Sequence, residues 1–243
     1  MDGVFWRDDL IDRNKLLNEA AIQSDDIIFI SEFSKKSFFS LYSNKKIKKE
    51  HVILNNVDEN IFYPTQKRKD KISLWGASAT NWNRKEKRPD ELLKFAEFIN
   101  RYNEKILIIG ESKIKHKNII NVGYFNDYKK LSNMINLTDS WVNFSYRDAA
   151  PKTVLQAIKC NKPILYSDSG GLSEIVEDFG VPIIDNKYID FAKCNFELNF
   201  EDIKKSYFLF KEMYNKNIFK KKKQKKYLKT LQEYVDIFKN SKK

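Results

Sequence analysis

The sequence contains few residues of the types that build the common nucleotide, protease and metal motifs. Its 243 residues include seven glycines, two histidines and two cysteines. The glycines never form G-x-G-x-x-G or a P-loop, which argues against a dinucleotide oxidoreductase and a P-loop kinase. No serine lies in G-x-S-x-G, and neither His51 nor His116 lies in H-E-x-x-H. We expect both histidines to be ordinary surface residues.

Sites for metals and disulfides are also scarce. Cys160 and Cys194 lie far apart and outside any C-x-x-C pair, so neither a disulfide framework nor a thiolate metal site is predicted. Acidic pairs occur at Asp8-Asp9 and Asp25-Asp26, but no D-x-D occurs. We therefore expect no metal and no other cofactor.

Long apolar runs are missing as well. No stretch of about 18 uncharged apolar residues appears, which argues against a membrane span. The N-terminus, MDGVFWRDDLID, has no basic segment followed by an apolar one, so a secretory signal is not predicted. These patterns favour a cytoplasmic protein.

The positive charge is concentrated in the tail. Of the net charge of +12, residues 201–243 carry fourteen lysines against five acids. The densest part, KKKKQKK at 220–226, lies within a predicted helix at 217–240 that has one apolar stripe. This basic tail could contact anionic lipid at a membrane or nucleic acid, or it could be a solvated surface with no partner.

Short apolar runs alternate with helical patterns through the rest of the chain. The predicted helices lie at 34–42, 89–102, 127–136, 151–160, 171–177 and 201–215. The predicted strands lie at 25–31, 51–56, 71–76, 105–110, 118–123, 140–145, 162–167 and 181–184. Apolar strands with helices between them indicate a parallel sheet covered on both faces. The sequence therefore predicts a doubly wound α/β fold.

This pattern is broken once, by VDENIFYPTQKRKD at 57–70, which we interpret as a linker. One complete α/β unit follows at 71–190, and basic helices complete the chain at 191–243. Residues 1–56 hold too few elements for a second sheet with its own core. We expect their strands either to extend the main sheet or to pack on another chain.

The stretch YRDAAPKTVLQAIKC at 146–160 is the strongest candidate for a site. It follows a predicted strand, and Pro151 suits the start of the next helix. In open α/β sheets, ligands bind at this edge, where the helix N-terminus attracts phosphate or hydroxyl oxygens. Asp148 and Gln156 could both bind sugar hydroxyls. Alternatively, Asp148 caps the helix and Gln156 is exposed.

Four ordered segments together resemble one family. SDDIIFISEFSKKSF, HVILNNVDENIFYP, ILIIG and APKTVLQAIKCNKPILYSDSGGLSEIV are similar to blocks of the C-terminal half of retaining family 4 glycosyltransferases, which have the two-domain GT-B fold. The resemblance spans Asp25 to Val181, about two thirds of the chain. It implies transfer of a sugar with retention, from a nucleotide-sugar donor, to a glycan or lipid-linked acceptor, without a metal. We favour a UDP-sugar.

The resemblance also implies which residues bind the donor. The family's paired glutamates, eight residues apart, correspond to Asp148, for the sugar, and Gln156, for the ribose. Its diphosphate-binding lysine is best matched by Arg88, and Ala77 or Ser78 replaces its arginine. The implied donor-binding set is Ser78, Arg84, Lys87, Arg88, Gly110, Asp148, Ala149, Ala150, Lys152 and Gln156.

The chain departs from the family in length. The family's acceptor-binding N-domain, which carries a catalytic histidine, has only a remnant here at 1–56, so the catalytic residues are unknown. The resemblance returns the C-terminal helix to that domain, which would leave an apolar stripe without its usual partner: Phe219, Leu228, Leu231, Val235 and Phe238. We expect a homodimer or a partner subunit. The alternatives are an inert nucleotide-sugar-binding subunit and a basic scaffold with a vestigial pocket.

Overall fold

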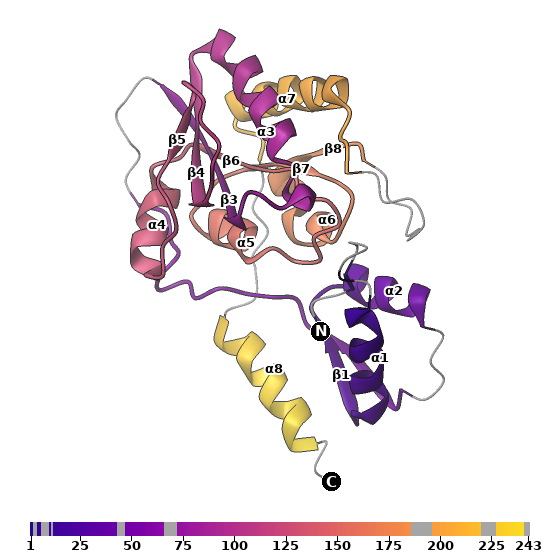
Figure 1. Cartoon of the computed structure of the whole chain (residues 1–243). Helices are drawn as coiled ribbons and strands as arrows, with labels where there is room; N and C mark the ends of the chain where they lie inside the picture. The colour runs from indigo at the N-terminus through magenta and orange to yellow at the C-terminus, as the bar shows by residue number, and fades with distance from the viewer. Residues whose placement is uncertain are drawn as a thin grey trace.

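The computed structural model describes residues 1, 4–5, 10, 12–42, 47–65, 72–185, 196–219 and 227–240. Two sheets are present in these ranges (Figure 1). The larger has six strands in the order β5-β4-β3-β6-β7-β8, and every neighbouring pair is parallel. Its strands are β3 (Ser73–Asn81), β4 (Glu104–Glu111), β5 (Ile119–Asn121), β6 (Ser140–Asn143), β7 (Ile164–Ser167) and β8 (Gly180–Ile183). The predicted doubly wound α/β fold is confirmed.

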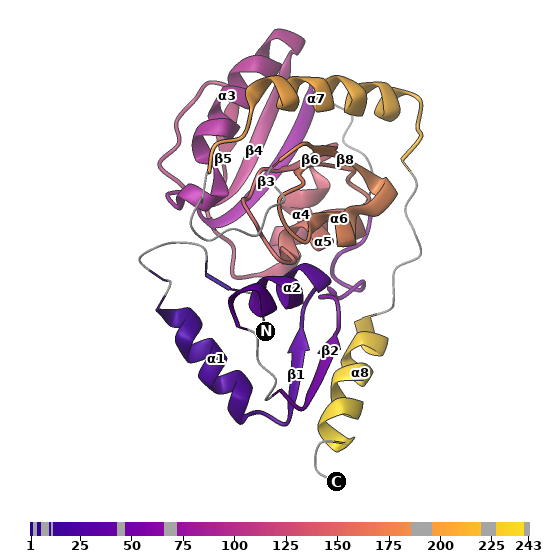
Figure 2. The ribbon, with the colours of Figure 1, turned by 90° about the vertical axis from the view of Figure 1, so that its right-hand side faces the viewer.

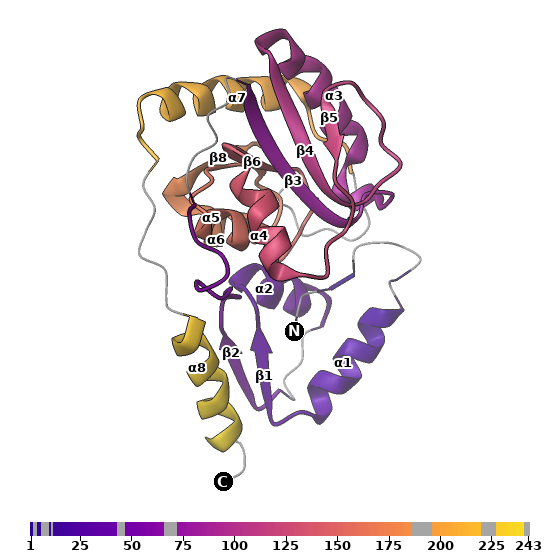
Figure 3. The same cartoon turned by 90° about the vertical axis from the view of Figure 1, so that its left-hand side faces the viewer.

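Helices cover both faces of this sheet (Figures 2 and 3). One face packs against α3 (Pro89–Ile99) and α7 (Phe200–Asn215). The other packs against α4 (Tyr128–Asn136), α5 (Lys152–Lys159) and α6 (Leu172–Val176). Leu74 and Trp75 are successive residues of β3 and belong to different cores, because side chains alternate across a strand.

The N-terminal unit consists of α1 (Arg13–Gln23), β1 (Asp26–Phe29), α2 (Glu32–Leu41) and β2 (Lys49–Val52). The two strands form a separate parallel pair, so the expectation that residues 1–56 hold too few elements for a second sheet with its own core is wrong. The unit has a small core of its own, in which Phe29 and Phe38 lie 5.8 Å apart between ring centroids. Helix α1 was not predicted, because only Asn14 and Ala21 are buried and no apolar stripe marks it in the sequence.

Two strand boundaries also differ from the predictions. β2 begins at Lys49 and ends at Val52, so most of the predicted strand at 51–56 is irregular chain. β3 continues five residues past the predicted end and reaches Asn81. Beside it, Gly110 has a φ of 121°, and a Cβ there would lie 1.7 Å from the carbonyl oxygen of Ala79. The glycine therefore lets β3 and β4 stay in close contact past the register shift that follows Ser78.

Helix α8 (Tyr227–Asn240) returns to the N-terminal unit, as the family resemblance implied. It lies beside β2, on the side away from α1 (Figures 2 and 3), and Asn56 Nδ2 donates to Thr230 Oγ1 at 3.2 Å. Part of the predicted apolar stripe is exposed, with Leu231, Val235 and Phe238 at 42%, 41% and 66% of full exposure. Phe219 is not on this helix and packs instead against Phe210, at 4.9 Å between ring centroids. The basic segment 220–226 and the side chain of Leu228 lie outside the described residues.

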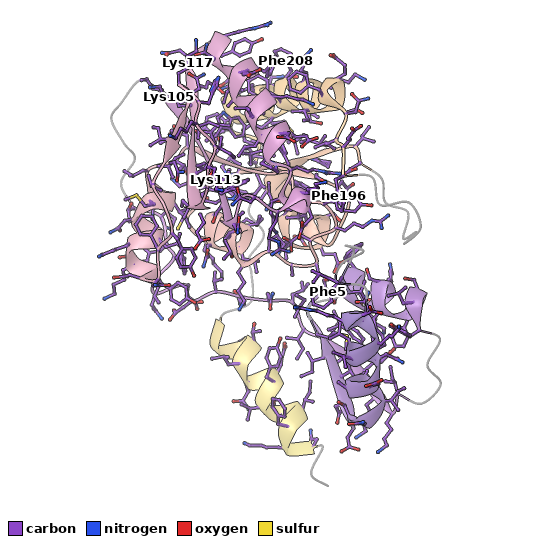
Figure 4. The ribbon with its side chains drawn as sticks, viewed as in Figure 1. Phe5, Lys105, Lys113, Lys117, Phe196 and Phe208 are labelled. Atoms are coloured by element: carbon purple, nitrogen blue, oxygen red, sulfur yellow. The ribbon has the colours of Figure 1, made fainter. Side chains whose placement is uncertain are left out.

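The carboxyl ends of the main strands face the N-terminal unit. In Figure 4, Lys105 marks the amino end of β4 at the far end of the molecule, near Lys117 and Phe208. Lys113 follows the carboxyl end of β4 and lies nearer to the N-terminal unit, where Phe5 is labelled. The edge at which open α/β sheets bind ligands is thus the edge on which the N-terminal unit lies.

Candidate functional site

The site lies where the strand order reverses. From β3 the chain proceeds outward through β4 to β5, then returns to place β6 on the other side of β3. The loops that follow β3 and β6 lie on either side of this switch point, where open α/β sheets bind ligands in a crevice. The loop after β3 contains the 3-10 turn η2 (Lys85–Lys87), and the loop after β6 leads into α5. The amide of Tyr146 donates to the carbonyl of Glu86 at 2.8 Å and holds the two loops together.

An ion pair connects the two loops across this crevice. Lys87 Nζ lies 2.7 Å from Asp148 Oδ2 and 3.5 Å from Ser145 Oγ. The side chains of Lys87 and Asp148 retain 19% and 20% of full exposure, so both can still be reached from solvent. The alternative in which Asp148 caps the following helix is wrong, because α5 has no side-chain cap at its N-terminus.

The Gly-Gly turn after β7 packs closely on the loop before α5. The amide of Gly171 donates to the carbonyl of Asp148 at 2.9 Å. A Cβ at Gly171 would lie 1.9 Å from the carbonyl oxygen of Ala149, and one at Gly170 would lie 2.4 Å from that of Asp148. Neither glycine has a positive φ. The two glycines are therefore needed for close approach of the backbones, which fixes the loop at the N-terminus of α5.

Gln156 is buried, and one of its polar atoms has no partner. Its exposure is 5%, and its Oε1 accepts no hydrogen bond from any described group. The alternative in which Gln156 is exposed is therefore wrong. All positions of α5 from Val154 to Lys159 are buried, because α4 and α6 flank this helix while the sheet lies beneath it. A buried acceptor without a donor costs about 1–3 kcal/mol, so its presence needs an explanation.

Arg88 does not occupy the position that the resemblance implied. The residue is 1% exposed, and its guanidinium bonds to Asp185 Oδ2 at 2.6 Å and to Ser167 Oγ and the carbonyl of Phe144, each at 3.1 Å. It also donates to the carbonyl of Phe196, whose side chain is labelled in Figure 4. The backbone of Arg88 is left-handed, with a φ of 54°, and its side chain is buried. The structure thus holds Arg88 in a buried ion pair with Asp185, whereas the partly exposed side chain of Lys87 lies beside Asp148.

The other predicted residues differ in how well they are placed. Ser78 is half-buried near the end of β3, Gly110 ends the straight part of β4, and Lys152 is exposed on the first turn of α5. Arg84 is exposed and pairs with Glu86. Ala149 and Ala150 are buried, and they pack against Ile30 and Phe33 of the N-terminal unit.

Several residues at this edge were not predicted, because their partners are distant in sequence. Asp185 follows β8 and neutralises Arg88 from 97 positions away. Arg147 has a φ of 49° and is 3% exposed, with its guanidinium 4.7 Å from the centre of the Tyr146 ring. Asn55 Nδ2 donates to the carbonyl of Ala150 at 3.1 Å. Asn55 lies near the carboxyl end of the predicted strand 51–56, which was the one signal in the sequence that could have identified it.

Neither a metal centre nor a membrane-crossing helix is found in the described ranges. They contain no group of three or more His, Cys, Asp or Glu side chains that could hold a metal ion. No helix within these ranges combines the length and the apolar character that crossing a membrane requires.

Comparisons with known proteins agree with the fold and its motifs. Residues 82–193 match the family model described as "Glycosyl transferases group 1". No curated protein sequence matches the chain. The match and the structures below confirm the resemblance to GT-B glycosyltransferases.

Solved structures with a similar fold share little sequence with this chain. Sucrose-phosphate synthase from Thermosynechococcus elongatus has 16% identity and a TM-score of 0.57, over 86% of this chain and 62% of that chain. A mutant of S. aureus TarM in complex with Fondaparinux, alpha-GlcNAc-glycerol and UDP has 18% identity and a TM-score of 0.63, over 98% and 49%. A chain of the GtfA/B complex has 15% identity and a TM-score of 0.54, over 87% and 41%. The chain thus spans between two fifths and two thirds of the length of these structures.

Proposed function

We propose that the segment 71–190 binds a nucleotide-sugar donor, with a UDP-sugar favoured, and that the protein takes part in transferring the sugar to a glycan or lipid-linked acceptor. One observation carries this proposal. A solvent-accessible Lys87–Asp148 pair, the uncapped N-terminus of α5 and the unpartnered Gln156 Oε1 belong to the same switch-point edge of the sheet. The family match over 82–193 and the UDP in the similar TarM structure support the choice of donor.

Each of these groups suits a different part of such a donor. Lys87 offers a positive charge to the diphosphate, and the free amides at the start of α5 add the favourable end of the helix dipole. Asp148 accepts hydrogen bonds from sugar hydroxyls. A ribose hydroxyl would give Gln156 Oε1 the donor that it lacks among the described residues. Ser78 and Gly110 border the crevice from β3 and β4.

The same groups would also assist the chemistry. Transfer breaks the bond between the anomeric carbon and the diphosphate, and negative charge grows on the leaving phosphate oxygen. In this proposal Lys87 and the N-terminus of α5 would stabilise that charge without a metal ion. Retention of configuration is part of this proposal and rests on the family resemblance. No residue of this chain is assigned as catalytic.

In this proposal the site for the acceptor is incomplete in this chain, which is why we propose a partner. The chain spans 62% of the sucrose-phosphate synthase chain and 49% of the TarM chain, and its N-terminal unit has a two-stranded sheet. We propose that a second copy of the chain or a partner subunit completes the acceptor site, as the name of the similar GtfA/B complex suggests for that protein. An inert nucleotide-sugar-binding subunit is the second candidate. Transfer of labelled sugar, measured with and without the partner, separates the two.

We also propose a cytoplasmic protein that contacts membranes through its basic tail. The lysines of 220–226 precede α8, on which Leu231, Val235 and Phe238 are exposed. Each lysine near an anionic surface contributes about 1 kcal/mol. Sedimentation with phosphatidylserine vesicles should be strong at low salt and should disappear when these lysines are made neutral. Stronger binding to RNA than to vesicles would favour the scaffold with a vestigial pocket.

Calorimetric titration with UDP, GDP and ADP tests the donor site. Lys87→Ala should weaken UDP binding roughly 10- to 100-fold, the range for a hydrogen bond to a charged group. Lys85→Ala is the matched control, because Lys85 is an exposed cation of the same 3-10 turn and is not in the donor-binding set. It should change the affinity less than about fivefold. The absence of any nucleotide binding to the unaltered protein would exclude the proposed donor site.

A further inference from the structure

The N-terminal unit and the sheet are connected by one carboxylate at two points. Glu174 lies on α6, just after the Gly-Gly turn. Its Oε2 accepts from the amide of Glu32 at 2.8 Å, and its Oε1 accepts from the amide of Phe33 at 2.7 Å. These are the first two amides of α2, and they are 142 and 141 residues away along the chain. Neither can find a partner within its own helix.

The carboxylate fits the end of α2 electrostatically. The N-terminus of a helix carries a partial positive charge, which a carboxylate stabilises. Ser31 caps the third amide, that of Ser34, at 3.0 Å, so Ser31 and Glu174 together satisfy the first three amides of α2. These bonds leave the start of α2 closed to other anions. We therefore interpret the N-terminus of α2 as the point at which the N-terminal unit contacts α6.

The N-terminal unit also contacts the loop before α5, which belongs to the proposed donor site. Ile30 and Phe33, which flank Ser31, pack on Ala149 and Ala150 in the loop before α5. A Cβ at Gly171 would lie 3.1 Å from Ser31 Oγ. Asn55, from the segment that follows β2, donates to the carbonyl of Ala150 at 3.1 Å. The N-terminal unit thus packs against the loop that contains Asp148.

We infer that Glu174 is a positioning residue that couples docking of the N-terminal unit to binding at the Asp148 loop. This inference rests on the proposed donor site for its second half only. Glu174 does not belong to the proposed donor-binding set. It orders α2 against α6, and the packed contacts of α2 in turn order residues 148–150. Because coupling of two equilibria is reciprocal, a donor that orders the loop should also strengthen docking of α2.

A graded series of variants tests the inference in the full-length protein. Glu174→Gln keeps one acceptor oxygen and should retain one of the two bonds, whereas Glu174→Ala retains none. Asp178→Asn is the matched control, because Asp178 is an exposed acid in the turn that follows α6. Amide hydrogen exchange over 30–36 should accelerate roughly 10- to 100-fold in Glu174→Ala, the range for a lost hydrogen bond to a charged group. It should accelerate less in Glu174→Gln and stay unchanged in Asp178→Asn.

The second readout is the affinity for UDP. It should fall in the same order, severalfold in Glu174→Ala, and UDP should slow exchange over 30–36 in the unaltered protein. Unchanged exchange in Glu174→Ala would overturn the docking role. Accelerated exchange with unchanged UDP affinity would overturn the coupling. If the unaltered protein binds no UDP, the proposed function and the coupling fail together, and the exchange data still decide the docking role.

Discussion

The sharpest prediction concerns Arg88, because the structure gives it a role opposite to the one that its sequence position suggested. Arg88→Met removes the guanidinium and keeps an unbranched apolar side chain in its place. The Asp185 side chain would then remain 4% exposed and hydrogen-bonded to Ser167 Oγ, but without the guanidinium that faces it. The substitution therefore removes the positive half of a buried ion pair and leaves the negative half in place.

The expected cost follows from that geometry. Removing one partner of a buried ion pair costs about 3–5 kcal/mol, mainly because the other charge stays buried. Each kcal/mol lowers the melting temperature by roughly 2–4 °C in a chain of this size, so we expect a decrease of roughly 6–20 °C. Part of the loss comes from the Tyr146 ring, whose centre lies 5.1 Å from the guanidinium carbon.

Two further variants make the measurement decisive. Arg84→Met changes the same residue type in the same loop, but its side chain is 45% exposed, so the cost should stay below about 1 kcal/mol. The double variant Arg88→Met with Asp185→Leu removes both charges and should regain most of the stability. Melting temperatures from calorimetry, with denaturant titrations for the free energies, provide the readout. A cost for Arg88→Met as small as that for Arg84→Met would refute the structural role, and with it the choice of Lys87 over Arg88.

Four other substitutions test the backbone at two glycines, the buried Gln156 and the buried Lys159. Gly110→Ala should prevent folding into the native structure, because its Cβ would overlap the carbonyl oxygen of Ala79. Gly123→Ala is the control: its Cβ would meet open space, so only the positive φ of 77° is unfavourable, and thermal melting should show a cost of about 1 kcal/mol. Gln156→Leu should raise the stability of the nucleotide-free protein or leave its stability unchanged, and it should weaken UDP binding about fivefold in calorimetry. A strong loss of stability would contradict the finding that Oε1 has no partner among the described residues. Burial lowers the pKa of Lys159 below its ordinary value of 10.5, so at neutral pH the charged side chain destabilises the folded protein. This destabilisation decreases as the pH rises through the lowered pKa toward 10.5. Lys159→Met should therefore stabilise the protein at pH 7 and lose this advantage above about pH 11, in urea titrations at both values.

The sequence alone was sufficient for the parallel α/β order and for placing the loop before α5 at the carboxyl edge of the sheet. Apolar runs such as KILIIG and SWVN form buried strands wherever helices cover both faces, and this signal is contained within a few residues. The loop that starts α5 was identified for the same reason, since a strand, a turn and a proline are local features. Helix α1 was missed because no apolar stripe marks it: only Asn14 and Ala21 are buried, and Asn14 is a polar residue that exchanges two hydrogen bonds with the backbone of Phe5.

Which side chain of a neighbouring pair reaches the site was decided by the tertiary structure. Lys87 and Arg88 are adjacent cations and look equivalent in the sequence. The left-handed backbone at Arg88 directs it inward to Asp185, while Lys87 meets Asp148, and both partners come from other strands' loops. Gln156 is buried, and Glu174 holds α2, through residues that approach only when the chain has folded. Periodicity is set within one helix or strand, but a charge acquires its role from the partner that the fold brings to it.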